Sequence, residues 1–144
     1  MGNRGHPPGK TDADAGIYLG QSVARVATSP DGMTVLIGRT ARDNDVLSLK
    51  LAAPRDFWFH VAGESGSHVV VRNPDKLDVL PRETKRFAAA LAAGYSKARQ
   101  GGRTAVHMAQ ACDVGKRSGM APGKVTLRRY ATVHAHPLRL DDDA

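Results

Sequence analysis

Two short segments separated by a glycine-containing connection constrain the fold of this sequence more than any other feature. The first is Asp56–His60 (Asp-Phe-Trp-Phe-His), and the second is Gly66–Arg72 (Gly-Ser-His-Val-Val-Val-Arg). Aromatic and β-branched residues in runs of this length, joined by a short connection with Gly, are typical of a β-hairpin. The sequence therefore predicts a hairpin near the middle of the chain, around which the rest must pack.

Side chains alternate between the two faces of a strand, so each segment predicts which residues share a face. On the first strand, one face is predicted to be core and carries Phe57, Phe59 and Val61. Trp58 and His60 share the opposite face. On the second strand, one face carries His68, Val70 and Arg72. We expect one side of the hairpin to be buried and the other to present Trp, His and Arg to a partner.

The remaining pattern predicts an α+β fold, with a mixed or antiparallel sheet built from hairpins and two main helices. The helices are expected at about 40–51, opened by Thr40 as a cap, and at 82–99, opened after Pro81. Gly94 lies inside the second helix, where glycine costs about 1 kcal/mol, and a close contact is the expected compensation. Further strands are expected at 22–28, 33–38, 104–108, 124–129 and 131–136.

The domain organisation is predicted to be simple. Residues 1–16 have little to bury and are expected to form a disordered arm, 17–138 a single domain, and 139–144 an acidic tail. No apolar run approaches the roughly 18 residues that a membrane span requires, so a cytoplasmic protein with no membrane partner is expected. The single cysteine, Cys112, excludes an internal disulfide and a Cys-rich zinc site.

Positive charge is the strongest indication of a partner. The chain has a net charge of +7 and a pI near 10.0. Between residues 82 and 129, eleven Lys and Arg are accompanied by only two acidic residues. Solvated lysines on ordinary surfaces would be interspersed with acids, so this concentration favours a surface that follows nucleic-acid phosphates. An anionic membrane is less favoured because the basic helix is Ala-rich where an interfacial helix has Trp, Phe and Leu.

Two segments are candidates for phosphate contacts. The loop 115–124 combines glycines with Lys116, Arg117 and Lys124, although it could also be a plain connection between strands. At the start of the first helix, Arg39, Arg42 and Asn44 could bind phosphate at free backbone N–H groups, or could only cap the helix and form local ion pairs. The residues alone leave both alternatives open.

The histidines and Asp56 permit an enzymatic alternative. Asp56, His60 and His68 lie close in sequence and could act on RNA or a nucleotide if they met in a cleft with shifted pKa values. No serine lies in a nucleophile-elbow motif, and the histidines lack metal-ligand spacing. We therefore expect a binding module rather than an enzyme, with no cofactor and no metal.

Three successive segments, Gly38–Asp45, Asp56–Val61 and Gly66–Arg72, together resemble the signatures of the NFACT-R domain family. The Ala-rich segment 88–99, the Lys-Arg pair of the loop and the sequence Pro-Gly-Lys-Val at 122–125 agree with it, so the resemblance covers about 23–137. The family often has Pro where this chain has Ser65 and Ser118, which implies looser loops here.

The resemblance implies an RNA-binding module. The family is best known as part of large proteins that attend stalled large ribosomal subunits, hold tRNA and support untemplated tailing of the nascent chain. Because 144 residues leave no room for the family's other modules, a free-standing copy is expected, and tailing is not carried over. The expected partner is tRNA or ribosomal RNA, in translation, ribosome quality control or RNA modification, with the ribosome as a further possible partner. A ribosome-associated protein-interaction adaptor is a third alternative, and oligomeric state is left open.

We thus predict an RNA-binding surface centred on the hairpin, with the cations as phosphate ligands and with Trp58 as a stacking face if it is exposed, or as a merely structural residue if it is not. His60, His68 and Arg72 are expected either to contact the RNA backbone or base edges or to order the hairpin. The predicted residues of this surface are Arg39, Arg42, Asn44, Trp58, His60, His68, Arg72, Lys97, Lys116, Arg117 and Lys124.

Overall fold

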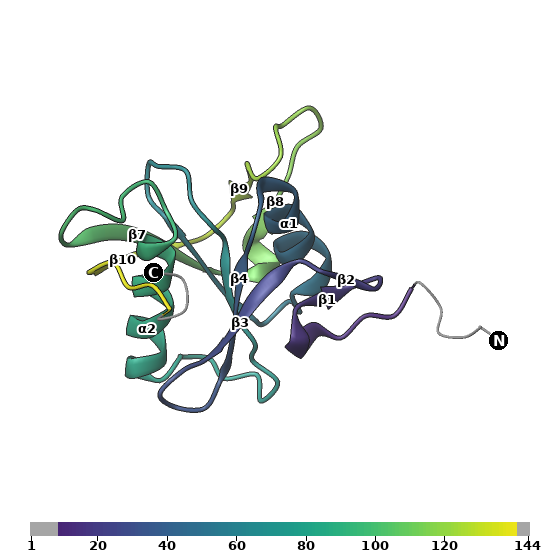
Figure 1. Cartoon of the computed structure of the whole chain (residues 1–144), viewed down its shortest axis with the longest axis horizontal. Helices are drawn as coiled ribbons and strands as arrows, with labels where there is room; N and C mark the ends of the chain where they lie inside the picture. The colour runs from purple at the N-terminus through teal and green to yellow at the C-terminus, as the bar shows by residue number, and fades with distance from the viewer. Residues whose placement is uncertain (1–8, 141–144) are drawn as a thin grey trace.

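The computed structural model describes residues 9–140, and Figure 1 shows its course. Residues 1–8 of the predicted arm and 141–144 of the predicted tail lie outside the described residues. The helical elements are Ala13–Ala15 (η1, a 3-10 helix), Ala41–Val46 (α1), Leu47–Leu51 (η2, a π-helical turn), Arg82–Gly94 (α2) and Ala111–Asp113 (η3, a 3-10 helix). The strands are Ile17–Tyr18 (β1), Gln21–Ser22 (β2), Ala24–Thr28 (β3), Thr34–Gly38 (β4), Phe57–Val61 (β5), Val69–Val71 (β6), Thr104–Gln110 (β7), Val114–Gly115 (β8), Thr126–Leu127 (β9) and Ala131–Ala135 (β10).

A six-stranded sheet in the order β10-β7-β5-β6-β4-β3 forms the frame of the molecule. Every neighbouring pair is antiparallel, and the predicted central hairpin is confirmed, with Phe57 opposite Val71 and Phe59 opposite Val69. Two small hairpins, β1-β2 and β8-β9, stand outside it. The predicted α+β fold is confirmed in its antiparallel form.

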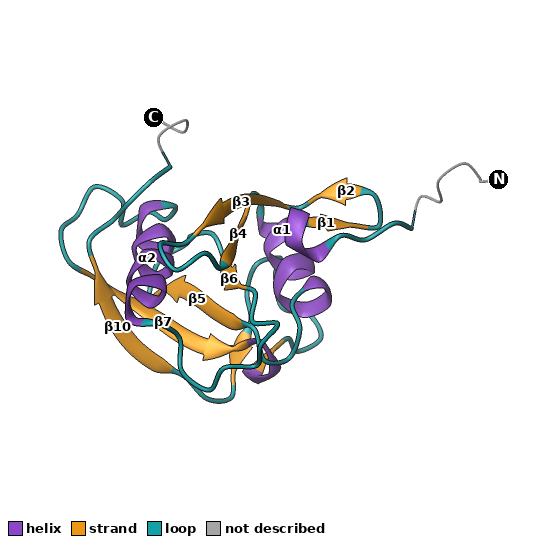
Figure 2. Ribbon diagram, turned by 90° about the horizontal axis from the view of Figure 1, so that it is seen from below, coloured by secondary structure: helices purple, strands orange, loops and turns teal. Residues whose placement is uncertain are grey.

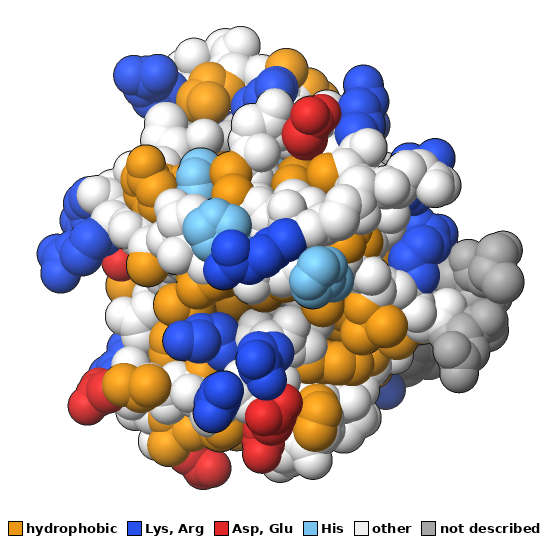
Figure 3. Space-filling view, turned by 90° about the vertical axis from the view of Figure 1, so that its left-hand side faces the viewer, with side chains coloured by type: hydrophobic (Ala, Val, Ile, Leu, Met, Phe, Trp, Pro, Cys, Tyr) orange, Lys and Arg blue, Asp and Glu red, His pale blue; other side chains and the backbone are white. Residues whose placement is uncertain are grey.

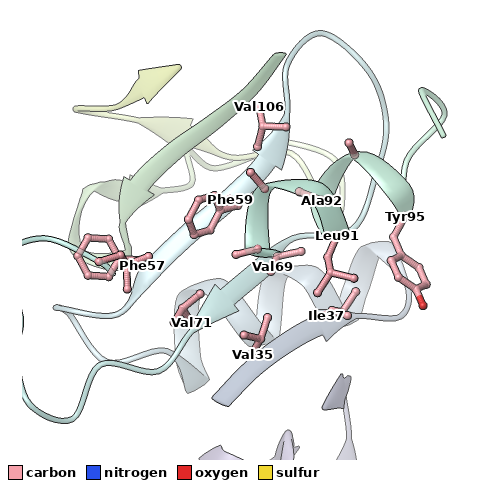
Figure 4. Close-up of a cluster of buried hydrophobic side chains, with 14 residues drawn as sticks. Val35, Ile37, Phe57, Phe59, Val69, Val71, Leu91, Ala92, Tyr95 and Val106 are labelled. Atoms are coloured by element: carbon pink, nitrogen blue, oxygen red, sulfur yellow. The ribbon is translucent and has the colours of Figure 1, made fainter. Parts of the chain in front are cut away.

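Helix α2 covers one face of the sheet (Figure 2) and closes the larger hydrophobic core with it. Phe57, Phe59, Val69 and Val71 of β5 and β6 cluster with Leu91 of the helix, with Phe57 at the end of the cluster away from Leu91 (Figure 4). Four of the five alanines of α2 are buried too, and their short side chains let the helix approach the sheet closely. The prediction that Phe57, Phe59 and Val61 form core is confirmed.

The opposite face of the sheet is also buried, which the sequence analysis did not expect. A second core there contains Trp58 and Val70, which pack with Leu36 and with Leu47 and Leu51 of the π-helical turn. Trp58 is only 1% exposed. The expectation that Trp58 presents a stacking face to a partner is therefore wrong, because α1 and the turn after it fold back over this side of the hairpin.

Both predicted helices exist, but their ends differ from the prediction. The first is α1, capped by the Thr40 side chain, followed directly by η2. The second ends at Gly94 rather than near residue 99. Gly94 is in contact with the crossing C-terminal segment: a Cβ there would lie 1.9 Å from the Leu138 carbonyl oxygen. The expected close contact at Gly94 is confirmed, and it occurs where the chain leaves the helix.

The N-terminal and late segments complete the fold. Part of the segment expected to be an arm is described: it contains η1, and Asp14 pairs with Arg72 at 3.1 Å. The strand expected at 124–129 is shorter, since β9 covers Thr126–Leu127 and pairs with β8. Among residues 9–140, no helix has both the length and the apolar character that crossing a bilayer requires.

Candidate nucleic-acid interface

A cleft of about 490 Å³ lies where the end of α2 meets the connections that follow β4, β5 and β8. Six cationic side chains from five separate segments line this cationic cleft: Arg25, Arg39, Lys97, Arg99, Lys124 and Arg139. Glu64 is the one acidic residue among the described residues that line it. All of the cations except the half-buried Arg25 are exposed, so the cleft is strongly positive and open to solvent.

The wall at the end of α2 is built by main-chain pairing. The Ser67 N–H donates to the Tyr95 carbonyl at 2.9 Å, and the Lys97 N–H donates to the Ser65 carbonyl at 2.9 Å. The two segments approach so closely that a Cβ on Gly66 would lie 2.6 Å from Cβ of Ser96. Glycine at 66 therefore allows the pairing that brings Lys97 to the rim.

Two arginines of the cleft stack against one aromatic ring. The guanidinium carbons of Arg139 and Arg25 lie 4.3 Å and 5.3 Å from the centre of the Tyr95 ring. Arg139 also donates to the Gly94 carbonyl at 3.1 Å. Cation–π contacts of this kind restrict a guanidinium without neutralising it. The Tyr95 ring thus brings Arg25 of β3 and Arg139 of the C-terminal segment together on one wall of the cleft.

A buried hydrogen-bond relay runs behind the cleft, from Trp58 through Ser48 and His68 to Gly123. Trp58 Nε1 donates to Ser48 Oγ at 2.9 Å, and Ser48 Oγ lies 2.7 Å from Nδ1 of His68. His68 Nε2 lies 3.0 Å from the Gly123 carbonyl oxygen. Since a carbonyl only accepts, Nε2 carries the proton, Nδ1 accepts from Ser48, and each group in the relay has a partner.

The relay requires a neutral His68, and its surroundings favour that form. Burial, followed by the neighbouring His60, lowers the pKa of His68 from 6.5 to about 4. Burial, and then His107, also lower the pKa of His60. Near neutral pH both rings are therefore uncharged, and His60 can offer the cleft hydrogen bonding and a ring face but no charge.

The loop between β8 and β9, which projects at the top of Figure 1, is held to α1 at its base. Asp45 accepts from the Gly123 N–H at 3.1 Å and pairs with Lys116 Nζ at 3.2 Å. Lys116 also donates to the carbonyls of Ala121 and Lys124, each at 2.7 Å. With His68 on the Gly123 carbonyl, these bonds fix the side of the loop that presents Lys124 to the cleft.

Five of the predicted residues line the cleft: Arg39, Asn44, His60, Lys97 and Lys124. Asn44 is buried and accepts from the His68 N–H at 3.0 Å, which orders the start of α1. A Cβ on Gly38 would lie 2.0 Å from the Asn44 side-chain oxygen, so the glycine makes room for this amide.

The other predicted residues lie elsewhere. Arg42 and Arg117 are exposed near the cleft but do not line it, and Lys116 is engaged within its own loop. Trp58 and His68 are buried in the relay. Arg72 follows β6, at the opposite end of that strand from the cleft, and it pairs there with Asp56 and Asp14.

The structure does not assemble the site that the catalytic alternative requires. Asp56 accepts from the N–H groups of Ala53 and Asn73 at 2.9 and 2.8 Å, and it pairs with Arg72. It lies just before β5 and precedes His60 by four positions, a separation of about 13 Å in extended chain. Within residues 9–140, no three His, Cys, Asp or Glu side chains gather in a way that could hold a metal ion.

Among the cationic and aromatic residues that line the cleft, four were not predicted: Arg25, Tyr95, Arg99 and Arg139. Arg99 belongs to the basic region that the sequence analysis recognised. Arg25 is a lone cation on the apolar strand 22–28, a signal that could have been followed. Arg139 lies in the segment that was expected to be an acidic tail, and nothing in the local sequence connects it with Tyr95.

Figure 3 shows the side of the molecule that lies to the left in Figure 1, with Lys and Arg spread over it beside histidines and with few acidic side chains. The positive surface thus extends beyond the cleft, over the side on which α2 and β10 lie (Figures 1 and 3).

Comparisons with known proteins identify the relatives of this chain. Two curated proteins named Rqc2 homolog RqcH are similar: one from Streptococcus suis is 41% identical over 108 residues, and one from Bacillus subtilis is 35% identical over 111 residues. These alignments cover 74% and 76% of this chain but only 19% and 18% of the relatives, so the chain spans about one fifth of their length.

A solved structure and a family description agree with these relatives. The C-terminal part of the fibronectin/fibrinogen-binding protein from Streptococcus suis superposes with a TM-score of 0.76 at 33% identity, covering 85% of this chain and 47% of that one. Residues 23–129 match the family described as the NFACT protein RNA binding domain. This match spans the hairpin, the relay and most of the cationic cleft, and the chain therefore belongs to the NFACT-R family of RNA-binding domains.

Proposed function

We propose that this domain binds RNA, with tRNA or ribosomal RNA as the ligand, by holding the sugar–phosphate backbone in the cationic cleft. The observation that carries the proposal is the convergence of six cations from five segments on one concavity with a single acid. Phosphate contacts supply most of the sequence-independent affinity of nucleic-acid-binding proteins. The family to which the chain belongs supports RNA as the polyanion.

The predicted residues divide into two roles within this proposal. Arg39, Lys97 and Lys124 are exposed on the rim and contact phosphates directly. Lys116, Asn44 and His68 order the walls from behind, since their polar groups are engaged with the protein. Outside the cleft, Arg42 and Arg117 extend the positive surface and meet more distant parts of a large RNA.

Neutral polar groups in the cleft complement its cations. Residues 65–67 approach the end of α2 at the rim, and the His60 ring lines the same hollow in its neutral form. Neutral donors and acceptors beside cations suit the ribose hydroxyls and phosphate oxygens of RNA. The domain thus recognises the backbone and shape of its ligand in the cleft.

The proposal is tested by measuring the binding of fluorescently labelled tRNA to the chain by anisotropy across a series of salt concentrations. Log affinity falls with log salt, and removing one cation that contacts a phosphate makes this slope shallower by about 0.7 to 0.9. The triple variant R39Q/K97Q/K124Q should therefore reduce the slope by about 2 to 3. Ribosomal RNA fragments serve as the second ligand in the same assay.

Arg82→Gln is the matched control, because Arg82 is exposed at the opposite end of α2 from the cleft. It removes one charge and should leave the slope within error of the parent chain. No binding of tRNA or ribosomal RNA at low salt would contradict the proposal, as would equal losses from Arg82→Gln and Lys124→Gln.

The biological setting is also a proposal. The RqcH relatives suggest that the RNA is met in the cytoplasm, on or near the ribosome, in translation quality control. A protein-interaction adaptor that uses the same surface is the alternative, and co-purification of a partner after RNase treatment would favour it. The name of the Streptococcus suis structure suggests fibronectin and fibrinogen as protein ligands to include in that experiment.

A further inference from the structure

Tyr130 differs from every other large aromatic side chain of residues 9–140. It is 54% exposed, whereas the remaining Phe, Tyr and Trp residues are buried or half-buried. An exposed aromatic ring in a basic protein is a natural platform for a nucleic-acid base, because every base has a flat face that stacks without regard to sequence. Trp58, the stacking residue expected from the sequence, is unavailable in the core.

The Tyr130 ring has a defined support. It packs on the ring of His107, with centroids 4.5 Å apart and a tilt of 48°. His107 lies on β7, within the sheet, so the contact holds an exposed side chain against a rigid element. A platform that is ordered before binding loses less side-chain freedom when a base stacks on it.

Tyr130 is connected to the cationic cleft through the sheet. His107 lies directly opposite His60 in the β5-β7 register, and His60 lines the cleft. Neighbouring strands are about 4.8 Å apart, so the platform begins one strand away from the cleft. The exposed Arg129 precedes Tyr130 in the chain, and the two line a second, shallow hollow together with Asp78 and Asp113.

We propose that Tyr130, supported by His107, is the base-stacking contact of the RNA site and holds an unpaired base of an RNA whose backbone occupies the cationic cleft. This inference rests on the proposed function and adds to it the class of ligand. The RNA has at least one unstacked nucleotide beside the phosphates that the cleft holds, as in a loop, a bulge or a single-stranded end.

The test compares Tyr130→Ala and Tyr130→Phe with the parent chain, using tRNA and a single-stranded oligoribonucleotide that contains 2-aminopurine. Tyr130→Ala should weaken binding by about 5- to 150-fold, the range expected for one stacked base. The salt slope should stay unchanged, because no phosphate contact is lost. Tyr130→Phe keeps the ring and should bind within about two-fold of the parent.

Further variants separate stacking from indirect effects. Leu19→Ala truncates another exposed apolar side chain, 51% exposed in the turn between β1 and β2, which lie on the opposite side of the molecule from β10 (Figure 1), and it should leave binding unchanged. His107→Ala removes the support of the ring and should give a smaller loss than Tyr130→Ala. The parent chain should quench 2-aminopurine fluorescence, and Tyr130→Ala should not.

The failures of the two proposals can be told apart. RNA binding that Tyr130→Ala leaves unchanged overturns this inference alone. So does a loss that comes with a smaller salt slope, because Tyr130 would then act by positioning cations. If the parent chain binds no RNA at low salt, the proposed function is overturned, and this inference with it.

Discussion

The two faces of the β5-β6 hairpin are both buried, but by different means. Toward α2, Phe57, Phe59 and Val71 belong to a cluster of buried hydrophobic side chains. On the other face, Trp58 and His68 are joined by a hydrogen-bonded relay that ends on the main chain of the loop carrying Lys124. The first face can serve stability alone, whereas the second also fixes the position of a wall of the cationic cleft.

This difference matters because hydrocarbon contacts have no direction, whereas hydrogen bonds do. The relay has one consistent arrangement of protons, which sets the tautomer of His68 and places the Gly123 carbonyl. Substitutions on the α2 face should therefore change mainly the free energy of unfolding. Substitutions on the relay face should change stability and RNA binding together.

The largest effect is expected on the α2 face. Phe59 is fully buried, and Phe59→Ala should lower the free energy of unfolding by about 3–5 kcal/mol through lost burial and a cavity. Trp58→Phe keeps most of the buried ring and loses one N–H donor, so less than about 2 kcal/mol is expected. Urea denaturation followed by circular dichroism measures both. An equal or larger loss in Trp58→Phe would show that the relay, rather than hydrocarbon packing, dominates stability.

The second effect is a pH dependence that belongs to the relay face. The pKa of His68 is about 4 in the folded chain, against 6.5 ordinarily. As the pH falls, the unfolded chain therefore takes up a proton on this histidine before the folded chain does. The stabilisation is complete above about pH 6.5 and is lost as the pH falls toward 4, amounting to about 3 kcal/mol. The lowered pKa of His60 acts in the same direction.

Urea denaturation between pH 4 and 7.5, followed by the fluorescence of the single, buried Trp58, measures this dependence. His68→Gln removes the titrating group and should flatten the profile, although the variant is less stable at pH 7. The exposed His134 provides the control, because His134→Gln exchanges a histidine outside the relay for the same amide. A steep profile that persists in His68→Gln would assign the pH dependence to another group.

The alternation of the hairpin was sufficient to predict the core face, because a period of two is a local property of a strand. The burial of Trp58 was not predictable in this way. It depends on Leu47 and Leu51, which return over the sheet from a π-helical turn that the sequence pattern does not distinguish from a regular helix. Family resemblance identified the correct signatures, but it did not indicate which of them were structural.

Only part of the cleft was predictable from the sequence, because some of its residues are brought together by tertiary contacts. Arg39, Lys97 and Lys124 lie in basic or glycine-rich segments, which local composition identifies. Arg25 and Arg139 both stack on Tyr95 in the cleft, and these contacts join segments far apart in the chain. Arg25 leaves only the weak signal of a lone cation on an apolar strand, and Arg139 leaves no periodic or compositional signal.

The smallest expected effects separate two lysines that the sequence could not tell apart. Lys116 is paired with Asp45, 71 residues away, and bonds two carbonyls of its own loop, whereas Lys124 is exposed at the cleft. Lys116→Gln should lower the free energy of unfolding by about 1 kcal/mol and leave the salt slope of RNA binding unchanged. Lys124→Gln should change stability by less than about 0.5 kcal/mol and reduce the slope by about 0.7 to 0.9.

For the comparison to hold, the free energy of unfolding must change mainly in Lys116→Gln, and the salt slope must change mainly in Lys124→Gln. Should Lys116→Gln reduce the slope as much as Lys124→Gln at unchanged stability, Lys116 would be a phosphate ligand, and its bonds to the loop would have to open on binding. Asp45→Asn provides the internal check, because it weakens the same loop anchor without removing a cation. It should reproduce the stability loss of Lys116→Gln and keep the full slope, since a loop cation contributes to the slope only where it meets a phosphate.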